Sequence, residues 1–330
     1  MISAPGKALL CGEYGVLEGG TAVVAAVGRR LRVEREPPST AYHRPGPEAV
    51  AATAASEREF GKITPPLRFD ASALFRDGKK LGLGSSAAAA VGAAAAVAVA
   101  RGFDLDEPGI RDRVFAAALE GHRAVAPEGS GVDVAASTYG GFLEFRIGED
   151  AVVDASPVRG PASLAPALVW TASPVRTSDL VSRVKALQVR DASRYARLMA
   201  SLVELGSAFA RAFREGDVRS VIRCAAQYHE AMRGLGNHTG APIVTRELDA
   251  VAEWAALEGG AAKPCGAGGG DAAVAFFSDP GARASFLERC SGHGLVPIDL
   301  PWGVPGVRAD EPRRRDYGDD VSAGRAASSR

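Results

Sequence analysis

The sequence predicts an α+β fold, and three observations support this class. Residues 8–34 alternate short apolar runs with glycine-rich turns, as the strands of a sheet do. The middle of the chain carries longer segments with helical periodicity. Residues 268–300 then follow the pattern strand, helix, strand. Strands and helices that are grouped in separate runs are typical of an α+β protein.

Residues 86–101 are almost entirely alanine and valine, which predicts a helix buried on nearly all sides. Further amphipathic helices are expected later in the chain, and Asp217 is suited to cap one of them. Residues 137–147 and 167–174 are expected to be strands. The other expected helices span residues 108–126, 178–190, 193–214, 217–234 and 245–258.

The order of these elements predicts two domains with a division near residue 160. We expect an N-terminal domain at residues 1–160 and a C-terminal domain at residues 161–307. Two segments have few apolar residues to bury, and we expect them to be poorly ordered. They are the proline-rich residues 34–49 and a disordered tail at residues 308–330.

Composition excludes several function classes. The 39 basic and 39 acidic side chains balance, so the totals favour neither nucleic acid nor a membrane surface as a partner. Four widely spaced cysteines, Cys11, Cys224, Cys265 and Cys290, indicate reduced thiols rather than disulfides or a zinc site. With no signal peptide or spanning segment in the sequence, we expect a cytoplasmic protein.

Residues 80–90 read KLGLGSSAAAA and place two glycines and two serines directly before the alanine-rich helix. Glycine lets a ligand approach the backbone, and the first amides of a helix have no intrahelical partner. Gly82, Gly84, Ser85 and Ser86 therefore fit a phosphate-binding loop, while Ser85 is equally suited to cap the helix. The Walker pattern GxxxxGK[ST] is absent, and the charged FRDGKK before the loop disfavours a dinucleotide-binding strand.

Three further stretches contain residues suited to phosphate chemistry. Lys7 follows a Pro-Gly turn and either projects into a pocket or is a solvated charge at a strand end. Asp133 follows GSG and either orients a nucleophile or caps a helix. The glycine run at residues 266–270 either lies close to an anionic ligand or forms a flexible hairpin.

The four motifs APGK, GLGSSAA, GSGVD and GAGGGD, taken in this order, resemble the GHMP family of small-molecule kinases over residues 1–305. The resemblance implies a first domain like the second domain of ribosomal protein S5 and a ferredoxin-like second domain, with ATP between them. It also implies roles for individual residues. These are Lys7 and Asp133 in catalysis; Gly82, Leu83, Gly84, Ser85, Ser86 and Ala87 in ATP binding; Lys7, Ser130, Gly131, Gly268, Gly269 and Gly270 in substrate binding; and Ser85 and Ser86 as ligands of Mg²⁺.

Details of the motifs look similar to the phosphomevalonate kinase branch of this family. They are Tyr14 in GEY, Lys80 before GLGSS, Asp271 after the glycine run, and RTSDLVSRV at residues 176–184. That branch transfers phosphate from ATP to the phosphate group of 5-phosphomevalonate. An ionised phosphate acceptor needs little help from a base, so Asp133 is expected mainly to orient groups. The expected small-molecule kinase is a monomer or a homodimer.

Two alternatives stay open. One is mevalonate kinase or another GHMP kinase, and the other is a non-catalytic ligand sensor on the same fold. In mevalonate kinases a glutamate that binds Mg²⁺ stands eleven residues before the catalytic aspartate, where this chain has His122. Glu120 or Glu128 could replace that glutamate, or the metal could rest on Ser85, Ser86 and the nucleotide. His122 itself is either a contact to substrate phosphate or an ordinary helix residue. Arg176, Thr177 and Ser178 either touch substrate or begin a helix.

Overall fold

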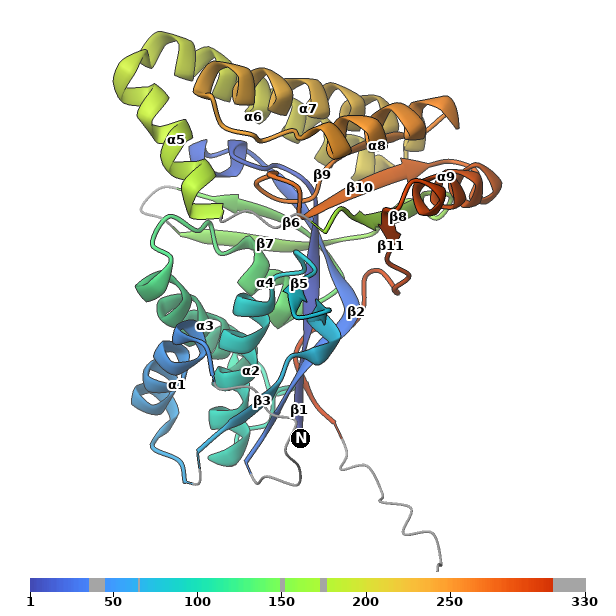
Figure 1. Cartoon of the computed structure of the whole chain (residues 1–330). Helices are drawn as coiled ribbons and strands as arrows, with labels where there is room; N and C mark the ends of the chain where they lie inside the picture. Colours follow the sequence, from blue (N-terminus) through green and yellow to red (C-terminus); the bar gives the residue numbers. More distant parts are fainter. Residues whose placement is uncertain (36–44, 65, 149–151, 173–176, 311–330) are drawn as a thin grey trace, which may run out of the picture.

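The structure, a computed structural model, describes residues 1–35, 45–64, 66–148, 152–172 and 177–310. It has two main antiparallel sheets, each covered by helices (Figure 1). The first sheet runs in the order β12, β1, β2, β6, β7, and β3 pairs with β2. Its strands are β1 (Ile2–Cys11), β2 (Ala22–Glu34), β3 (Arg68–Asp70), β6 (Phe142–Ile147), β7 (Val153–Val158) and β12 (Arg308–Ala309).

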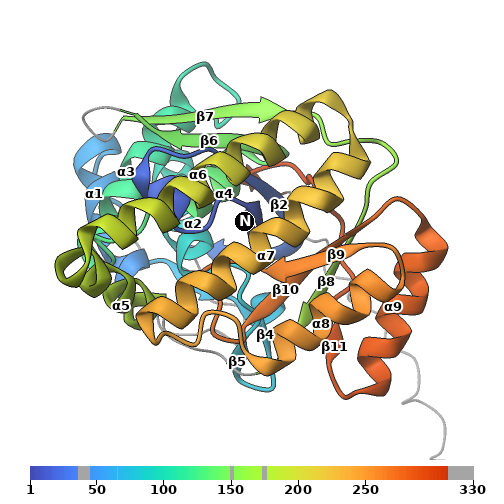
Figure 2. The ribbon, with the colours of Figure 1, turned by 90° about the horizontal axis from the view of Figure 1, so that it is seen from above.

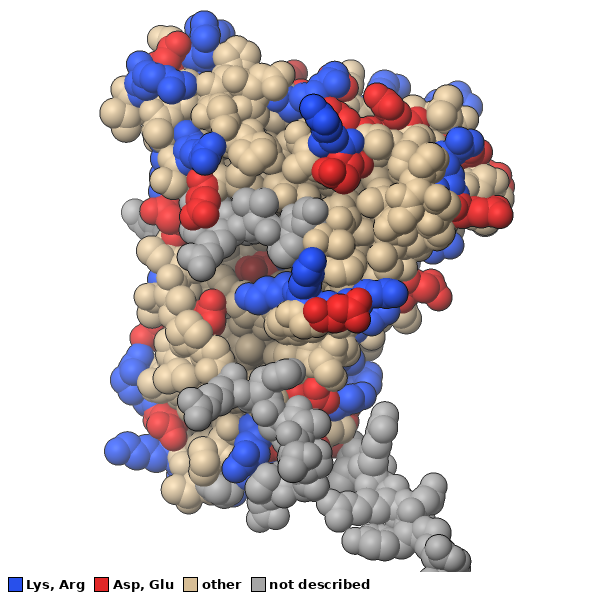
Figure 3. All heavy atoms as spheres, in the orientation of Figure 1, with Lys and Arg blue, Asp and Glu red and all other residues tan. Residues whose placement is uncertain are grey.

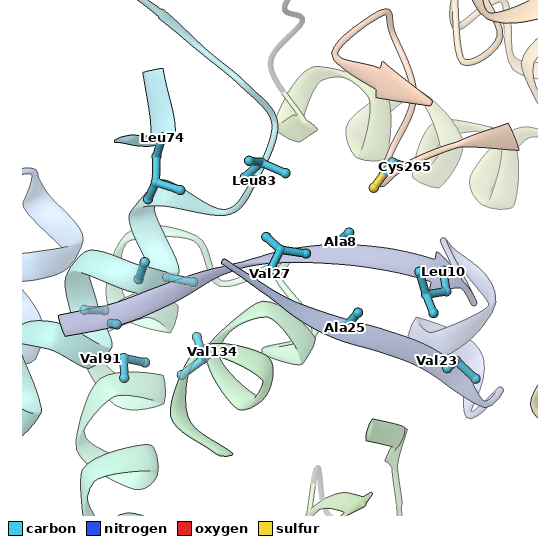
Figure 4. Packing of buried hydrophobic residues seen from close by; sticks show 14 of the residues in the cluster. Ala8, Leu10, Val23, Ala25, Val27, Leu74, Leu83, Val91, Val134 and Cys265 are labelled. Atoms are coloured by element: carbon cyan, nitrogen blue, oxygen red, sulfur yellow. The ribbon is translucent and has the colours of Figure 1, made fainter. Parts of the chain in front are cut away.

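Four helices belong to the first lobe, where α2 and α4 pack on the sheet and α1 and α3 pack on these helices and on each other. They are α1 (Pro47–Phe60), α2 (Ser85–Ala100), α3 (Ile110–Val125) and α4 (Val132–Tyr139). The side chains of α2 are small and mostly fully buried, as its composition predicts. A Cβ atom at Gly92 of α2 would lie 2.8 Å from a Val33 methyl group, so the helix packs very close to β2. Figure 4 shows Val91 of α2 and Val134 of α4 beneath these strands.

The second sheet belongs to the second lobe and runs in the order β11, β8, β10, β9. Apolar side chains of β8 and β10 pack against α8 and α9 on one face, while Phe276 of β10 contacts Phe209 of α6 on the other. Helix α7 lies against β9 and β10 on that second face, and α6 packs beside α7 and against η1 (Gly15–Glu18), β1 and β2, as the view from above shows (Figure 2). The elements of this lobe are β8 (Ala165–Trp170), α5 (Thr177–Arg190), α6 (Ala192–Glu215), α7 (Val218–Thr239), α8 (Arg246–Leu257), β9 (Ala261–Pro264), β10 (Ala272–Phe277), α9 (Pro280–Gly292) and β11 (Val296–Pro297).

Short elements lie where the two lobes meet. They are the 3₁₀ helices η1 (Gly15–Glu18) and η2 (Ser72–Leu74) and the hairpin of β4 (Phe75–Arg76) and β5 (Lys79–Lys80). After β11 the chain returns to the first lobe, where Pro301 accepts a hydrogen bond from the Gly28 amide at 2.9 Å. No described helix is both long and apolar enough to cross a membrane.

The α+β class is confirmed, and the six expected helices appear within a few residues of their predicted bounds. The Asp217 carboxylate caps α7 by accepting from the Ser220 amide at 3.0 Å. Two expectations were wrong. Helix α1 begins at Pro47, inside the segment expected to be poorly ordered, and residues 137–139 end helix α4 instead of starting a strand.

The expected tail does not include Arg308 and Ala309, because they pair with Ser3 and Ile2 of β1. Residues 36–44 and 311–330, also expected to be poorly ordered, lie outside the described residues. The division near residue 160 stays a prediction. Strand β7 of the first sheet ends at Val158, and strand β8 of the second sheet begins at Ala165.

Candidate active site

Residues 82–84, which we call the first glycine loop, lead directly into α2. Gly84 occupies the N-cap position in a left-handed conformation, with φ +73°, and Ser85 is the first helical residue. The expectation that Ser85 caps the helix is therefore wrong. The hydroxyls of Ser85 and Ser86 form no hydrogen bond within the described chain. The first amides of α2 and these two hydroxyls are thus available to an anion.

Lys7 lies in the middle of β1 and crosses the first glycine loop, so it is not a charge at a strand end. Its amide donates to the Leu83 carbonyl at 2.9 Å, and its Nζ donates to the Gly82 carbonyl at 3.4 Å. A Cβ atom at Gly84 would lie 2.9 Å from Lys7 Cγ. Glycine at position 84 therefore gives the lysine side chain room to pass over the loop.

Residues 266–270, which we call the second glycine loop, face the first loop from the other lobe. A Cβ atom at Gly82 would lie 3.1 Å from Asp271 Cβ, and one at Gly266 would lie 3.9 Å from Lys7 Nζ. Gly268 has φ +86°, and a Cβ atom there would lie 2.1 Å from the Ile243 carbonyl oxygen. The Gly269 amide also donates to that oxygen at 2.9 Å, so residue 243 contacts this loop, which connects the antiparallel strands β9 and β10.

Glu13 and Tyr14 of the first lobe hold the second glycine loop. Glu13 Oε1 accepts from Lys263 Nζ at 2.5 Å and from the Gly266 amide at 3.1 Å. The Tyr14 hydroxyl donates to the Ala267 carbonyl at 2.6 Å. The Glu13 and Lys263 side chains are 1% and 0% exposed, so this is a fully buried ion pair between the lobes.

Sequence reasoning missed the role of Lys263. The available signal was a single charged residue within the apolar strand AAKP, directly before a glycine-rich loop. A charge in such a strand is buried only with a partner, so the sequence did indicate that a partner exists.

Asp133 lies on α4 one turn before Ser137, whose hydroxyl donates to the Pro5 carbonyl of β1 at 2.8 Å. Residues four apart share one face of a helix, so Asp133 lies on the face directed toward β1. Gly131 is the N-cap of α4, and the alternative that Asp133 caps a helix is therefore wrong. The Ser130 hydroxyl accepts from the Val132 amide at 3.3 Å and closes the turn before α4.

His122 is buried in α3, and its Nε2 lies 3.9 Å from Asp133 Oδ2. The two carboxylates considered as replacements for a metal-binding glutamate are engaged elsewhere. Glu120 pairs with Arg58 at 2.5 Å, and Glu128 pairs with Lys185 of α5. Arg176 and the side chains of Thr177 and Ser178 lie outside the described residues.

Asp271 lies between two basic residues at the meeting of the glycine loops. Burial raises the pKa of Asp271, and the charges of Lys7 and Lys80 oppose that rise. Asp271 Oδ1 is buried without a hydrogen-bond partner in the described structure. The Lys80 carbonyl accepts from Trp170 Nε1 of β8 at 3.2 Å, which ties the β4–β5 hairpin to the second lobe. Figure 3 shows a hollow between the lobes with basic side chains beside it at the level of β5.

A cavity of about 520 Å³ lies between the lobes. Its walls come from Tyr14 and η1, the last turn of α3 with residues 127–129, and the facing sides of α5 and α6. Tyr14 connects the cavity to the second glycine loop, and Gly129 connects it to the turn before Asp133. A volume of this size is in the range of small-molecule sites.

The arrangement is suited to bringing two anionic groups together. The open start of α2, the two glycine loops and Lys7 offer donors and positive charge where phosphate oxygens would lie. Phosphoryl transfer depends mainly on such positioning and electrostatic stabilisation. Cys265 points from the second lobe toward Ala8 of β1 (Figure 4), and these residues belong to one buried cluster that continues across the lobes. The two lobes therefore hold the site together as one packed unit.

Comparison with known proteins agrees with this arrangement. The family model described as the GHMP kinases N terminal domain matches residues 49–141, and that of the GHMP kinases C terminal matches residues 209–294. The chain is 28% identical to a phosphomevalonate kinase of Streptomyces sp. (strain CL190), over 92% of this chain and 97% of that protein. It is 30% identical to a mevalonate kinase of Aeropyrum pernix, over 61% of this chain and 67% of that protein.

The fold is also similar to that of Streptococcus pneumoniae phosphomevalonate kinase, solved in complex with phosphomevalonate and AMPPNP. The TM-score is 0.73 at 20% identity, covering 92% of this chain and 99% of that one. The expected two-domain fold is thereby confirmed. With both family domains matched in order and a shared fold over nearly its whole length, the chain belongs to the GHMP kinase family of ATP-dependent phosphotransferases.

Proposed function

We propose that this kinase transfers the γ-phosphoryl group of ATP to the phosphate of 5-phosphomevalonate, forming the 5-diphosphate and ADP. The observation that carries the proposal is the meeting of Lys7, Lys80 and both glycine loops at one point between the lobes. Two phosphate groups repel each other, so a reaction between them needs positive charge at their meeting point. The relative in Streptomyces, named a phosphomevalonate kinase, supports the same acceptor.

In this reaction an oxygen of the acceptor phosphate attacks the γ-phosphorus, and the bond from the γ-phosphorus to the bridging oxygen of ADP breaks. Amides at the start of α2 and in residues 82–84 bind the ATP phosphates. Lys7 spans the first loop and neutralises charge that develops on the transferred group. Gly268, Gly269 and Gly270 let the backbone of the second loop lie close to an anion.

We assign Asp133 an orienting role. The acceptor phosphate is largely ionised at neutral pH, so no strong base is required. Asp133 is partly exposed, with 22% of its side chain accessible, and its Oδ1 accepts from the Val134 amide at 3.0 Å. A carboxylate fixed in this way can orient donors around the acceptor without removing a proton. Ser130 and Gly131 shape the turn that presents it.

We assign Mg²⁺ to oxygen atoms at the start of α2 together with the phosphate oxygens of the nucleotide. The described residues contain no group of three or more His, Cys, Asp or Glu side chains arranged to hold a metal ion. Mg²⁺ commonly keeps several waters and binds substrate phosphates with one or two protein oxygens. The unbonded hydroxyls of Ser85 and Ser86 are therefore the groups that would hold it, and the ion would offset phosphate charge there.

An assay of ADP release tests the proposal when mevalonate and 5-phosphomevalonate are offered separately to the purified protein. We expect turnover with 5-phosphomevalonate and little with mevalonate. Activity on mevalonate alone would instead favour the reaction named for the Aeropyrum pernix relative. If no ADP were released with either acceptor, the proposed reaction would be overturned, and a ligand sensor would be the better explanation.

A further inference from the structure

We propose that His122 is a positioning residue that holds the Asp133 carboxylate in the orientation needed for phosphoryl transfer. This inference rests on the proposed function, because it assigns how the orienting carboxylate of the same site is itself fixed. His122 lies in the last turn of α3, and Asp133 lies in the first turn of α4. Residues 126–131 connect the two helices and bring the ring beside the carboxylate, with His122 Nε2 3.9 Å from Asp133 Oδ2.

The imidazole ring of His122 is almost completely buried, with 7% of the side chain exposed. Its Nδ1 atom has no hydrogen-bond partner in the described structure. A Cβ atom at Gly129 would lie 3.8 Å from this Nδ1, so the turn before α4 covers that edge of the ring. Buried polar atoms are usually bonded, and an exception in a folded protein needs an explanation. The other ring nitrogen, Nε2, is the one that faces the carboxylate.

The two oxygens of Asp133 have different neighbours. Oδ1 accepts from the Val134 amide at 3.0 Å, whereas Oδ2 faces the His122 ring. Among the described residues, no lysine or arginine forms an ion pair with Asp133. Because 22% of the Asp133 side chain is accessible, the carboxylate has acceptor capacity left for groups of the substrate. The direction of that capacity depends on the group that holds Oδ2.

A neutral imidazole with its proton on Nε2 donates toward Oδ2 and fixes the plane of the carboxylate. The separation of 3.9 Å is longer than a hydrogen bond, and contacts of this kind in active sites often shorten when substrate binds. Because the ring is buried, His122 acts through Asp133 and not on the substrate phosphate directly. Its loss should therefore slow the reaction without weakening the binding of ATP.

Two variants of the full-length protein separate the hydrogen-bond donor from the volume of the ring. His122→Met removes the N–H group and fills the space with an apolar side chain, while His122→Gln retains an N–H donor. In the ADP-release assay with 5-phosphomevalonate, we expect His122→Met to lower kcat about 10- to 100-fold, the scale of losing a hydrogen bond to a charged group. The KM for ATP should stay within about twofold, and His122→Gln should recover part of kcat.

NMR of protein labelled at the histidine nitrogens tests the contact without turnover. The chain has five histidines, and the signals lost in His122→Met identify those of His122. We expect Asp133→Asn to shift the Nε2 signal of His122 and to leave the signals of His229 unchanged, because His229 bonds to Asp249 in the second lobe. His229→Met is the matched control for the kinetics. It removes a similarly buried ring outside the site and should leave kcat and both KM values unchanged.

Normal kcat in His122→Met, or an unshifted Nε2 signal in Asp133→Asn, would overturn the role of His122 and leave the proposed reaction intact. Equal losses in His122→Met and His122→Gln would mean that the ring acts by packing, which would overturn that role as well. Turnover of mevalonate alone would overturn the proposed reaction, while slow turnover of mevalonate by His122→Met would still support the role of His122. If neither acceptor led to ADP release, both would be overturned.

Discussion

The two glycine loops meet across Lys7, yet they obtain their shapes from different parts of the molecule. The first loop is continuous with α2, and its contacts with β1 lie within the first lobe. The second loop is held by Glu13 and Tyr14, which belong to the opposite lobe. The position of the second loop therefore depends partly on the contact between the lobes, in addition to the Ile243 carbonyl of its own lobe, whereas the backbone hydrogen bonds of residues 82–84 lie within the first lobe. Substitutions behind the second loop should therefore lower stability, and substitutions at the first loop should lower turnover.

The largest effect is expected from Lys263→Met, which removes one partner of the buried ion pair behind the second loop. Glu13 would remain as an uncompensated buried charge, and such losses cost about 3–5 kcal/mol. Chemical denaturation should therefore show a large decrease in the free energy of unfolding. Lys62→Met, at an exposed position, is the matched control and should leave stability nearly unchanged.

The double variant Glu13→Gln with Lys263→Met sharpens this prediction. It removes both charges and should recover a large part of the lost stability, since no isolated charge stays buried. If Lys263→Met were no less stable than Lys62→Met, the buried pair would not be what holds the second loop.

The next effect is expected at the first loop, where it concerns the rate of the reaction. Expressed as a free energy, it is smaller than the loss of stability in Lys263→Met. Lys7→Ala should lower kcat by at least about 10²-fold, which is the scale of losing one preorganised electrostatic group. Stability should change little, because Lys7 is only partly buried and its Nζ makes one hydrogen bond at 3.4 Å. Lys7→Met keeps the aliphatic part that passes Gly84 and should lose turnover to a similar degree. Near-normal kcat in either folded variant would exclude the proposed role of Lys7.

Local patterns in the sequence predicted the first loop better than the second. The two glycines, two serines and alanine run of residues 82–90 lie in one continuous stretch, and their physical meaning is local. Helix α1 also carries local signals in the sequence. Pro47 begins it, and buried alanines recur at 49, 52 and 55. The proline-rich composition around this helix masks the alanine spacing.

The anchoring of the second loop depends on partners that are remote in the sequence. Glu13 and Lys263 are 250 residues apart, and a motif can identify each residue without showing that they touch. Strand β12 likewise could not be predicted from a local pattern, because its partner β1 lies at the opposite end of the chain. The cavity likewise combines side chains from both lobes, so no local pattern in the sequence indicates it.

The smallest effect is expected from Asp271→Asn, which tests what the carboxylate at the end of the second loop does to stability. Burial raises the pKa of Asp271, so the folded state binds its proton more tightly than the unfolded state does. The slope of stability with pH is then negative between the ordinary pKa of an aspartate and the raised value. At pH values above the raised pKa, the ionised carboxylate destabilises the folded state. At pH values below the ordinary pKa of an aspartate, this destabilisation is absent.

Replacement by asparagine removes this cost, so Asp271→Asn should be more stable than the wild type at pH 7, by about 1 kcal/mol or less because the site is partly exposed. The difference should vanish below about pH 3.8, where the unfolded wild-type carboxyl is protonated as well. Thermal unfolding of both proteins at pH 7 and below about pH 3.8 measures the two differences in stability. Lower stability of Asp271→Asn at pH 7 would mean that Lys7 and Lys80 stabilise the carboxylate by more than its burial costs. The second loop would then be held partly by its contact with Lys7, and the separation between the two loops would be smaller than their hydrogen bonds indicate.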